Sequence, residues 1–274
     1  MRADLHVHSY FSDGLLSPED IAKSAAANGV ELIALTDHDN MLGCGETAKC
    51  CAARGIGFVE GIEISAYDGL TKIHTLGYGL DKNSNEYKAF SKELSDGSMQ
   101  RAEDIISKLN KCGVRLSMEE VKKEQAVKNI PLHVMHIAYA ASKKGYGSPF
   151  DFYNKYLNRG KPAFSNIARP TPERAVEVIK ACGGFSSLAH PGRIDMPADE
   201  LLKLIQRMKA CGLDGIEAVY SAHTAIETAY YKETANALHL LVTGGSDTHY
   251  PSGNRKIGTP VFYAEGTLAE KLKI

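Results

Sequence analysis

The sequence predicts an α/β fold in which a parallel sheet carries polar side chains at its strand ends. Short apolar strand-like runs alternate with helical segments over residues 1–83, and the same alternation resumes near residue 171. Strands and helices at this spacing imply right-handed βαβ units and a parallel sheet. The chain has 274 residues, a length at which a single α/β barrel is ordinary.

The composition is that of a globular protein without a strongly charged surface. Hydrophobic residues make up 43%, charged residues 24%, and the net charge is −1. This balance argues against binding to duplex DNA or to acidic membranes. No apolar run reaches the ~20 residues that span a bilayer, and the N-terminus lacks a secretory pattern. Because the six cysteines form no C-x-x-C motif, we expect reduced thiols and a cytoplasmic location.

The first part of the chain reads as four strands and two helices. A strand at the N-terminus precedes a helix that begins at Ser17-Pro18, where Ser is a good N-cap and Pro a good first residue, and ends near Gly29. The following elements are a buried strand at 31–39, a helix at 45–54, and strands at 57–66 and 71–80.

Residues 84–158 differ from this pattern because they contain no strong strand. Helices are expected at 84–111, 117–128, 131–144 and 150–157. We therefore interpret 84–158 as a helical insertion or lid subdomain, and 1–83 with 159–274 as the barrel.

The remainder returns to alternating strands and helices. A helix begins at Thr171-Pro172, and two more are expected at 198–210 and 223–237. Strands are expected at 185–193, 215–221 and 240–250.

Histidines and carboxylates gather at or near the ends of these predicted strands. His6 and His8 are two residues apart, so in a strand both imidazoles face the same side. Alone, such a pair is as easily a buried, locally hydrogen-bonded pair as a half metal site. The whole set, however, is what borderline divalent metals require, and burying it unpaired would be costly. It comprises His6, His8, Asp13, His38, Glu63, His74, His190, Asp247 and His249.

In chain order, the motifs H-x-H, TDHD, GIEIS, IHTLGY, AHPG and GGSDTH resemble the PHP (polymerase and histidinol phosphatase) family, and in particular its small stand-alone bacterial phosphoesterases. The resemblance implies a distorted (β/α)7 barrel with a helical insertion. It also implies three divalent metal ions, Mn, Fe or Zn with Mg as a further option. The implied ligand sets are His6, His8, Glu63 and Asp247; Asp13, His38 and His249; and His74 with His190, which Glu63 bridges to the first metal.

The implied activity is hydrolysis of a phosphate monoester of a small phosphorylated metabolite, a nucleoside mono- or 3',5'-bisphosphate, by a metal-bridging hydroxide. Three alternatives remain open. One is 5'-to-3' trimming of short RNA. Another is a metal-dependent amidohydrolase, against which His38, Glu63 and the Asp247-x-His249 pair argue. The third is a non-enzymatic domain that docks on a polymerase, against which the complete ligand set argues.

Five further residues are candidates for binding the substrate phosphate: Arg101, His136, Lys161, Arg193 and His223. Arg101 is expected to open a helix above the site, and His223 is also a candidate proton donor. No special role is expected for His133 or His239. Val134 and Ser98 stand where related sequences often have Arg, which leaves the choice between a bisphosphate and another substrate open.

Overall fold

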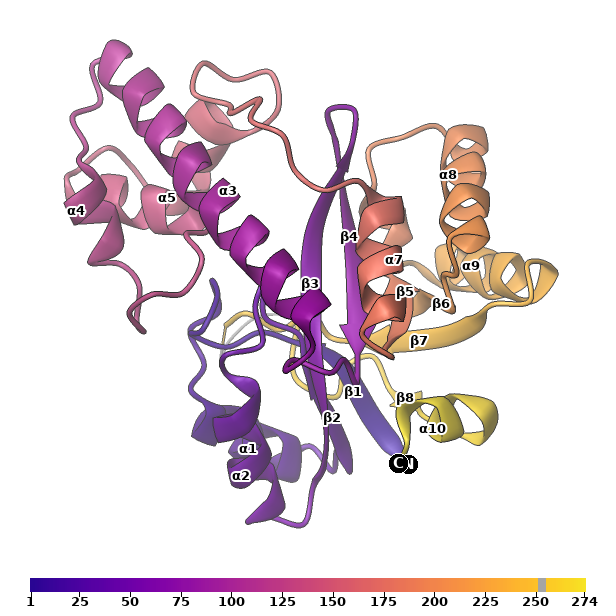
Figure 1. Cartoon of the computed structure of the whole chain (residues 1–274). Helices are drawn as coiled ribbons and strands as arrows, with labels where there is room; N and C mark the ends of the chain where they lie inside the picture. Colours follow the sequence, from indigo (N-terminus) through magenta and orange to yellow (C-terminus); the bar gives the residue numbers. More distant parts are fainter. Residues whose placement is uncertain (251–254) are drawn as a thin grey trace.

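The structure is a computed structural model that describes residues 1–250 and 255–274. Its described strands form one sheet in the order β7-β6-β5-β4-β3-β2-β1-β8 (Figure 1). The strands are β1 (Arg2–Val7), β2 (Leu32–Leu35), β3 (Gly57–Asp68), β4 (Thr71–Tyr78), β5 (Phe185–Leu188), β6 (Gly215–Tyr220), β7 (Leu241–Gly245) and β8 (Phe262–Tyr263).

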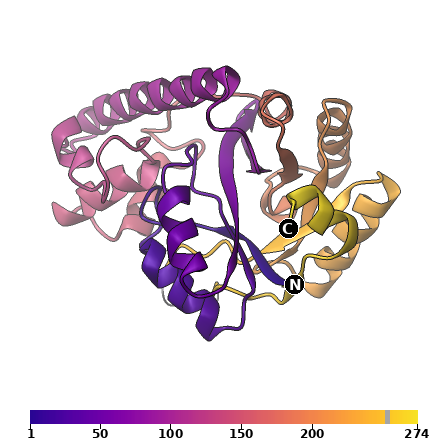
Figure 2. The ribbon, with the colours of Figure 1, turned by 60° about the horizontal axis from the view of Figure 1, so that its bottom comes forward.

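The sheet curls until its first strand meets the segment that follows β7. The His8 N–H donates to the Thr248 carbonyl over 3.0 Å, and the Asp247 N–H donates to the His6 carbonyl over 2.8 Å. The short β8, absent from our sequence prediction, runs antiparallel beside β1. The predicted fold class, a distorted α/β barrel with a helical insertion, is confirmed, although the described sheet has eight strands rather than the seven expected. The two chain termini lie close together (Figure 2).

The prediction of a wholly parallel sheet is wrong at β4, which runs antiparallel to both β3 and β5. Asp68 pairs with Thr71 across a two-residue turn in which Gly69 has φ 60°. A turn this tight joins antiparallel strands, whereas parallel strands need a long crossover. Because β4 is reversed, its early residue His74 pairs with Ser65 and lies at the end of the barrel where the parallel strands finish.

Helices pack around the barrel and begin largely where the sequence predicts. The side chains of Ser17 and Thr171 cap their helices by accepting hydrogen bonds from the N–H groups of Asp20 and Arg174. The helix α10 (Gly266–Leu272) was not predicted. These helices are α1 (Pro18–Ala27), α2 (Cys44–Ala52), α7 (Pro172–Ala181), α8 (Ala198–Ala210), α9 (Ala225–Ala237) and α10. Within the described residues, none of the helices is both long enough and apolar enough to cross a membrane.

The helical segment between β4 and α7 lies to one side of the barrel (Figure 1). It contains α3 (Asn85–Lys111), α4 (Met118–Lys122), α5 (Val134–Lys143), α6 (Pro149–Phe152) and a π-helical turn at Tyr153–Leu157. The helix predicted at 117–128 ends early, at Lys122. The first half of α3 packs into the barrel core, whereas its second half packs with α5 and α6 in a separate hydrophobic core. The long helix α3 therefore joins the two cores.

Candidate metal centre

Glu63 lies at the centre of a buried cluster that contains all nine predicted ligand residues. Its Oε1 atom is 2.7 Å from His74 Nδ1 and 3.0 Å from His190 Nε2. Its Oε2 atom is 3.1 Å from His38 Nδ1 and 3.2 Å from His8 Nε2. Side chains from β1, β3, β4 and the segments after β1, β2, β5 and β7 thus meet at one end of the barrel.

Three groups within this cluster have ligand atoms close enough to share an ion. The group of His6, His8, Glu63 and Asp247 matches the first predicted ligand set. A second group contains the predicted Asp13, His38 and His249 together with His8. The third joins His38, Glu63 and His74, and the Nε2 atom of His190 lies 3.3 Å from His74 Nδ1.

The cluster contains buried polar atoms that the protein itself does not satisfy. Within the described residues, nine buried side-chain polar atoms lack a hydrogen-bond partner, and six of them belong to the predicted ligands. Buried polar atoms are normally paired, so a concentration of unpaired ones needs an explanation. Imidazole nitrogens and carboxylate oxygens are ligands of divalent metals, so the donor set fits such ions. These six atoms are His8 Nδ1, Asp13 Oδ1, His38 Nδ1, Glu63 Oε2, His74 Nε2 and His190 Nδ1.

The electrostatics of the cluster also favour cations. Burial alone would raise the pKa values of Asp13, Glu63 and Asp247, but the surrounding histidines hold all three well below their usual range. Burial opposes protonation of His8, yet hydrogen bonds to Asp247 and Glu63 raise its pKa to about 10. Ionised carboxylates in a buried site require positive charge nearby. Protons on His6 and His8, whose pKa values the carboxylates raise, supply positive charge here, whereas burial lowers the pKa values of His38 and His74. Divalent cations bound to neutral imidazoles would replace those protons.

Residues around the ligands fix their orientation, and the sequence analysis did not identify these residues. The fully buried Glu217 accepts hydrogen bonds from His6 Nδ1 at 2.9 Å and from the backbone N–H of His190 at 2.8 Å. A carboxylate on the far nitrogen of a histidine sets the tautomer in which the near nitrogen can bind a metal. Tyr220 and Arg255 similarly bind one oxygen of Asp247, over 2.8 and 2.6 Å.

Asp37, in the segment after β2, holds the loop that carries Asp13 through hydrogen bonds. The carboxylate of Asp37 accepts hydrogen bonds from the hydroxyl groups of Ser9 and Ser12, each over 2.6 Å. On the opposite side, His190 and Asp247 adopt positive φ angles of 28° and 54°. Such strained conformations persist where the surroundings fix them, and they are frequent at functional sites.

The predicted substrate-binding histidines have other partners. His136 accepts from the N–H of His133 through Nδ1 and donates to the Ser12 carbonyl through Nε2. His223 uses its two ring nitrogens on the Ala218 carbonyl and the Gly192 N–H. Neither ring has a nitrogen left for a phosphate, so the structure gives both a role in holding loops, and the proton-donor prediction for His223 is not supported.

The predicted cationic residues fall into two groups. Arg101 does not open a helix as predicted, because α3 is continuous and Arg101 lies within it. Its side chain is buried, at 8% exposure. Lys161 and Arg193 lie on the surface. Within residues 1–250 and 255–274, neither side chain forms a hydrogen bond or ion pair with the cluster, so their phosphate-binding role stays a prediction.

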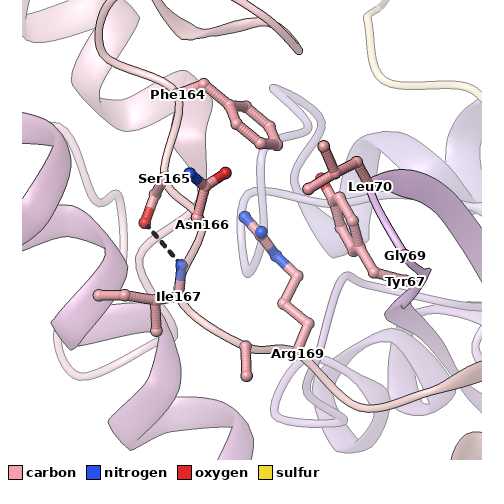
Figure 3. Close-up of a pocket in the computed structure, with 9 residues that line it drawn as sticks. Tyr67, Gly69, Leu70, Phe164, Ser165, Asn166, Ile167 and Arg169 are labelled. Atoms are coloured by element: carbon pink, nitrogen blue, oxygen red, sulfur yellow. Dashed lines mark hydrogen bonds between the residues drawn. The ribbon is translucent and has the colours of Figure 1, made fainter.

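A further cation, Arg169, was missed because it lies in an irregular segment with no motif. Its guanidinium group lies over the ring of Tyr67, 4.3 Å from the centroid, and the two side chains face a cavity of about 260 Å³ (Figure 3). The N–H of Tyr67 donates to the Pro170 carbonyl over 2.9 Å, which fixes this segment beside β3. Burial and the nearby charge of Arg169 together lower the pKa of Arg101.

A barrel with a buried histidine and carboxylate cluster at the strand ends defines the chain as a metal-dependent hydrolase. The comparisons make this specific, because the model of the PHP domain matches residues 4–161. The chain belongs to this family, and the predicted enzyme class, a phosphoesterase, is confirmed.

Relatives similar over nearly the whole chain have different named activities. The 3',5'-nucleoside bisphosphate phosphatase of Chromobacterium violaceum is 32% identical, covering 93% of this chain and 90% of the relative. The 5'-3' exoribonuclease of Haemophilus influenzae is also 32% identical, covering 93% and 92%. The phosphoribosyl 1,2-cyclic phosphate 1,2-diphosphodiesterase of Eggerthella lenta is 31% identical, covering 91% and 94%.

Among solved structures, a Chromobacterium violaceum protein described as an amidohydrolase with bound sulfate and no metal superposes with a TM-score of 0.85. It is 32% identical, and the alignment covers 93% of this chain and 90% of that chain. The predicted barrel is thus shared with a solved structure over nearly its full length.

Proposed function

We propose that this phosphoesterase removes one phosphate from a nucleotide that carries a second phosphate, as in a nucleoside 3',5'-bisphosphate. The observation that carries the proposal is the pair of arginines, Arg101 and Arg169, near Tyr67 on β3, the strand that also carries Glu63. The similarity to the Chromobacterium violaceum phosphatase supports the same substrate class.

The arginine pair and the cluster lie along one face of β3. Glu63, Ser65 and Tyr67 alternate along this strand and therefore point to the same side. At about 3.3 Å per residue, Tyr67 lies roughly 13 Å from Glu63 along the strand. A substrate with two phosphates can then place one at the cluster and the other near Tyr67 and the arginines.

The charge balance at the arginines favours an anion. Within the described residues, no hydrogen bond or ion pair is formed by the guanidinium group of Arg101 or of Arg169. Burial and the neighbouring Arg169 lower the pKa of Arg101 to about 10, so it stays charged near neutral pH. The nearby Asp39 accepts the N–H of Ser65 over 2.8 Å. The buried Arg101 and the half-buried Arg169 thus have a nearby carboxylate, Asp39, which already accepts a backbone hydrogen bond. This leaves net positive charge that a phosphate would balance.

Room for the Arg101 guanidinium is left by a glycine in the middle of α3. A Cβ atom on Gly97 would lie 2.9 Å from Arg101 Nη1. Ser98, where related sequences often carry Arg, instead accepts the Leu132 N–H through its hydroxyl group. In this chain, therefore, Arg169 from outside the insertion supplies the second cation.

The chemistry at the cluster follows from its donors. When bound, divalent cations lower the pKa of water and neutralise charge on phosphoryl oxygens. Three such ions are expected, held by the three predicted ligand sets. The protein residues orient these ligands through Glu217, Tyr220 and Arg255, and exclude water by burial. The scissile phosphate is positioned there while the arginines hold the distal phosphate.

The experiment is a phosphate-release screen with the protein loaded with Mn²⁺, Fe²⁺ or Zn²⁺. Substrates are nucleoside 3',5'-bisphosphates, the matching 3'- and 5'-monophosphates, a cyclic phosphate diester and short 5'-phosphorylated RNA. We expect the bisphosphate to have the highest kcat/KM. Arg101→Met and Arg169→Met each remove a charge-assisted contact and should lower kcat/KM by about 10- to 100-fold for the bisphosphate, with little change for a monophosphate.

Two results would overturn the proposal. One is equal kcat/KM for bisphosphate and monophosphates in the wild type. The other is processive shortening of RNA without phosphate release from the bisphosphate, which would favour an exoribonuclease. Lys92→Met, on an exposed part of α3, is the matched control for loss of one surface charge.

A further inference from the structure

The N-terminus of α5 rests on the loop that carries Asp13. His133, the residue before α5, places its Nδ1 atom 3.0 Å from Asp13 Oδ2. One turn later, His136 donates from Nε2 to the carbonyl of Ser12 over 3.0 Å. Two histidines of the helical insertion therefore contact two adjacent residues of a loop that belongs to the barrel.

The two carboxylate oxygens of Asp13 have different neighbours, because only one of them contacts His133. Oδ2 is bound by His133, while Oδ1 lies 3.3 Å from His249 Nε2 and 3.7 Å from His38 Nε2. Oδ1 has no hydrogen-bond partner within the described residues. The ring of His133 also lies parallel to that of His38, with 4.8 Å between centroids. His133 thus holds Asp13 in the orientation in which its free oxygen faces two other predicted ligands.

The same helix belongs to the core of the insertion. Ile137, Ala138 and Ala141 of α5 pack with Ile105 and Leu109 of α3 in the second hydrophobic core. Arg101 lies one turn before Ile105 on α3. The insertion therefore connects the position of Arg101 to the contact that α5 makes with Asp13.

We infer that His133 and His136 are positioning residues through which the insertion orients Asp13, so that metal binding at the Asp13 ligand set and docking of the insertion stabilise each other. This inference rests on the proposed metal site but not on the identity of the substrate. If the insertion docks more tightly on the metal-bound barrel, linkage requires that docking also tighten metal binding.

Three variants of His133 separate this role from helix capping. His133→Ala removes the Nδ1 atom that contacts Asp13 and that also caps α5, where it lies 3.4 Å from the Met135 nitrogen. His133→Asp keeps a good cap but places a negative charge against Asp13. His133→Asn keeps a cap and a donor at nearly the position of Nδ1. His239→Asn, at an exposed histidine with φ 51°, is the matched control because Asn tolerates this backbone region.

The readouts use the full chain and do not depend on turnover. Chelator competition with Mn²⁺ measures the affinity of each metal equivalent, and hydrogen exchange measures protection of the amides at the start of α5. In the wild type, His133→Asn and the control, we expect metal to slow exchange there. In the Ala and Asp variants we expect the affinity of one metal equivalent to fall by about 10- to 100-fold, with no added protection on metal binding.

Specific outcomes would overturn the inference. Wild-type affinity and protection in the Ala variant would show that His133 does not position Asp13. A second such outcome is weaker metal binding in the Ala variant together with wild-type or higher metal affinity in the Asp variant. That result would assign His133 to helix capping or to direct metal ligation. His136→Gln provides a second test, because loss of the Ser12 contact should reduce the same protection. Absence of bisphosphate turnover in a wild type that still shows the coupling would refute the proposed substrate alone.

Discussion

The hydroxyl group of Tyr220 donates a 2.8 Å hydrogen bond to Oδ2 of Asp247, while Oδ1 of the same carboxylate lies 3.3 Å from His8 Nε2. Tyr220, together with Arg255 on the same oxygen, thus determines which oxygen of Asp247 faces the cluster. Asp13 and His133 repeat this arrangement on the other side of the site. Each predicted carboxylate ligand outside β3 therefore has one oxygen bound by the protein and one left for a metal.

The contact between Tyr220 and Asp247 predicts a loss of metal affinity in Tyr220→Phe. Removing the hydroxyl group takes away one of the two groups that hold Oδ2 and leaves Arg255 as the other. Loss of such supporting hydrogen bonds typically weakens metal binding by about 10- to 100-fold. Chelator competition measures the change. Tyr230→Phe, at an exposed tyrosine of α9, should bind metal as the wild type does. Equal affinity in the two variants would contradict the role of Tyr220.

Glu217 predicts a similar effect through a histidine. Glu217→Gln keeps the side-chain volume but turns one of the two acceptor atoms into a donor, which faces either His6 Nδ1 or the His190 N–H. We expect metal affinity to fall by about 10- to 100-fold, measured by elemental analysis after dialysis against a weak chelator. The control is Glu93→Gln, exposed on α3. Unchanged metal content in Glu217→Gln would show that His6 does not depend on this carboxylate.

Metal binding should release protons. In the metal-free protein the pKa of His8 is raised from its ordinary value to about 10 by Asp247 and Glu63, against the effect of burial. His8 is then protonated near neutral pH, and a metal binds only its neutral form. Apparent affinity should therefore rise as pH increases toward 10 and fall as pH decreases. Calorimetry in two buffers with different ionisation enthalpies counts the protons, and we expect at least one per chain. A count of zero would contradict the coupling.

The contact of β7 with β1 requires a glycine. A Cβ atom on Gly245 would lie 2.5 Å from the backbone nitrogen of His6, and backbone atoms cannot move aside cheaply. Gly245→Ala should lower the free energy of unfolding by about 2–3 kcal/mol or more. Gly45→Ala in α2, where a Cβ would meet nothing within 4 Å, should change it by less than about 0.5 kcal/mol. Denaturant unfolding compares the two, and equal stability would argue against this close packing.

The ligand residues could be predicted from the sequence because they lie on strands or in the segments that follow them, and parallel strands bring their ends together. Helix starts at Ser17 and Thr171 were predictable for a similar reason, since caps are local. His74 was predicted as a ligand although β4 runs in the opposite direction. The glycine at position 69 indicates a tight turn between β3 and β4, which would make the two strands antiparallel. The regular alternation of strands and helices elsewhere led us to predict a parallel pair instead.

The supporting residues could not be predicted because their roles depend on contacts far apart in the chain. Glu217 reaches His6 across 211 positions and Arg255 reaches Asp247 from beyond the last ligand strand. We predicted no role for His133, because nothing in the neighbouring sequence indicates that it contacts the distant loop that carries Asp13. Conversely, His136 and His223 fitted the expected rim positions, but backbone groups occupy both of their ring nitrogens.

Metal titration of the chelated protein with a nucleoside 3',5'-bisphosphate tests the central claim most directly. We expect the metal-free chain to release no phosphate. As Mn²⁺ fills the sites, phosphate release should return, with one phosphate freed per substrate molecule. The His38→Ala variant should not regain activity. Full turnover by the chelated protein, or by His38→Ala, would contradict the assignment of this cluster as the metal centre of the enzyme.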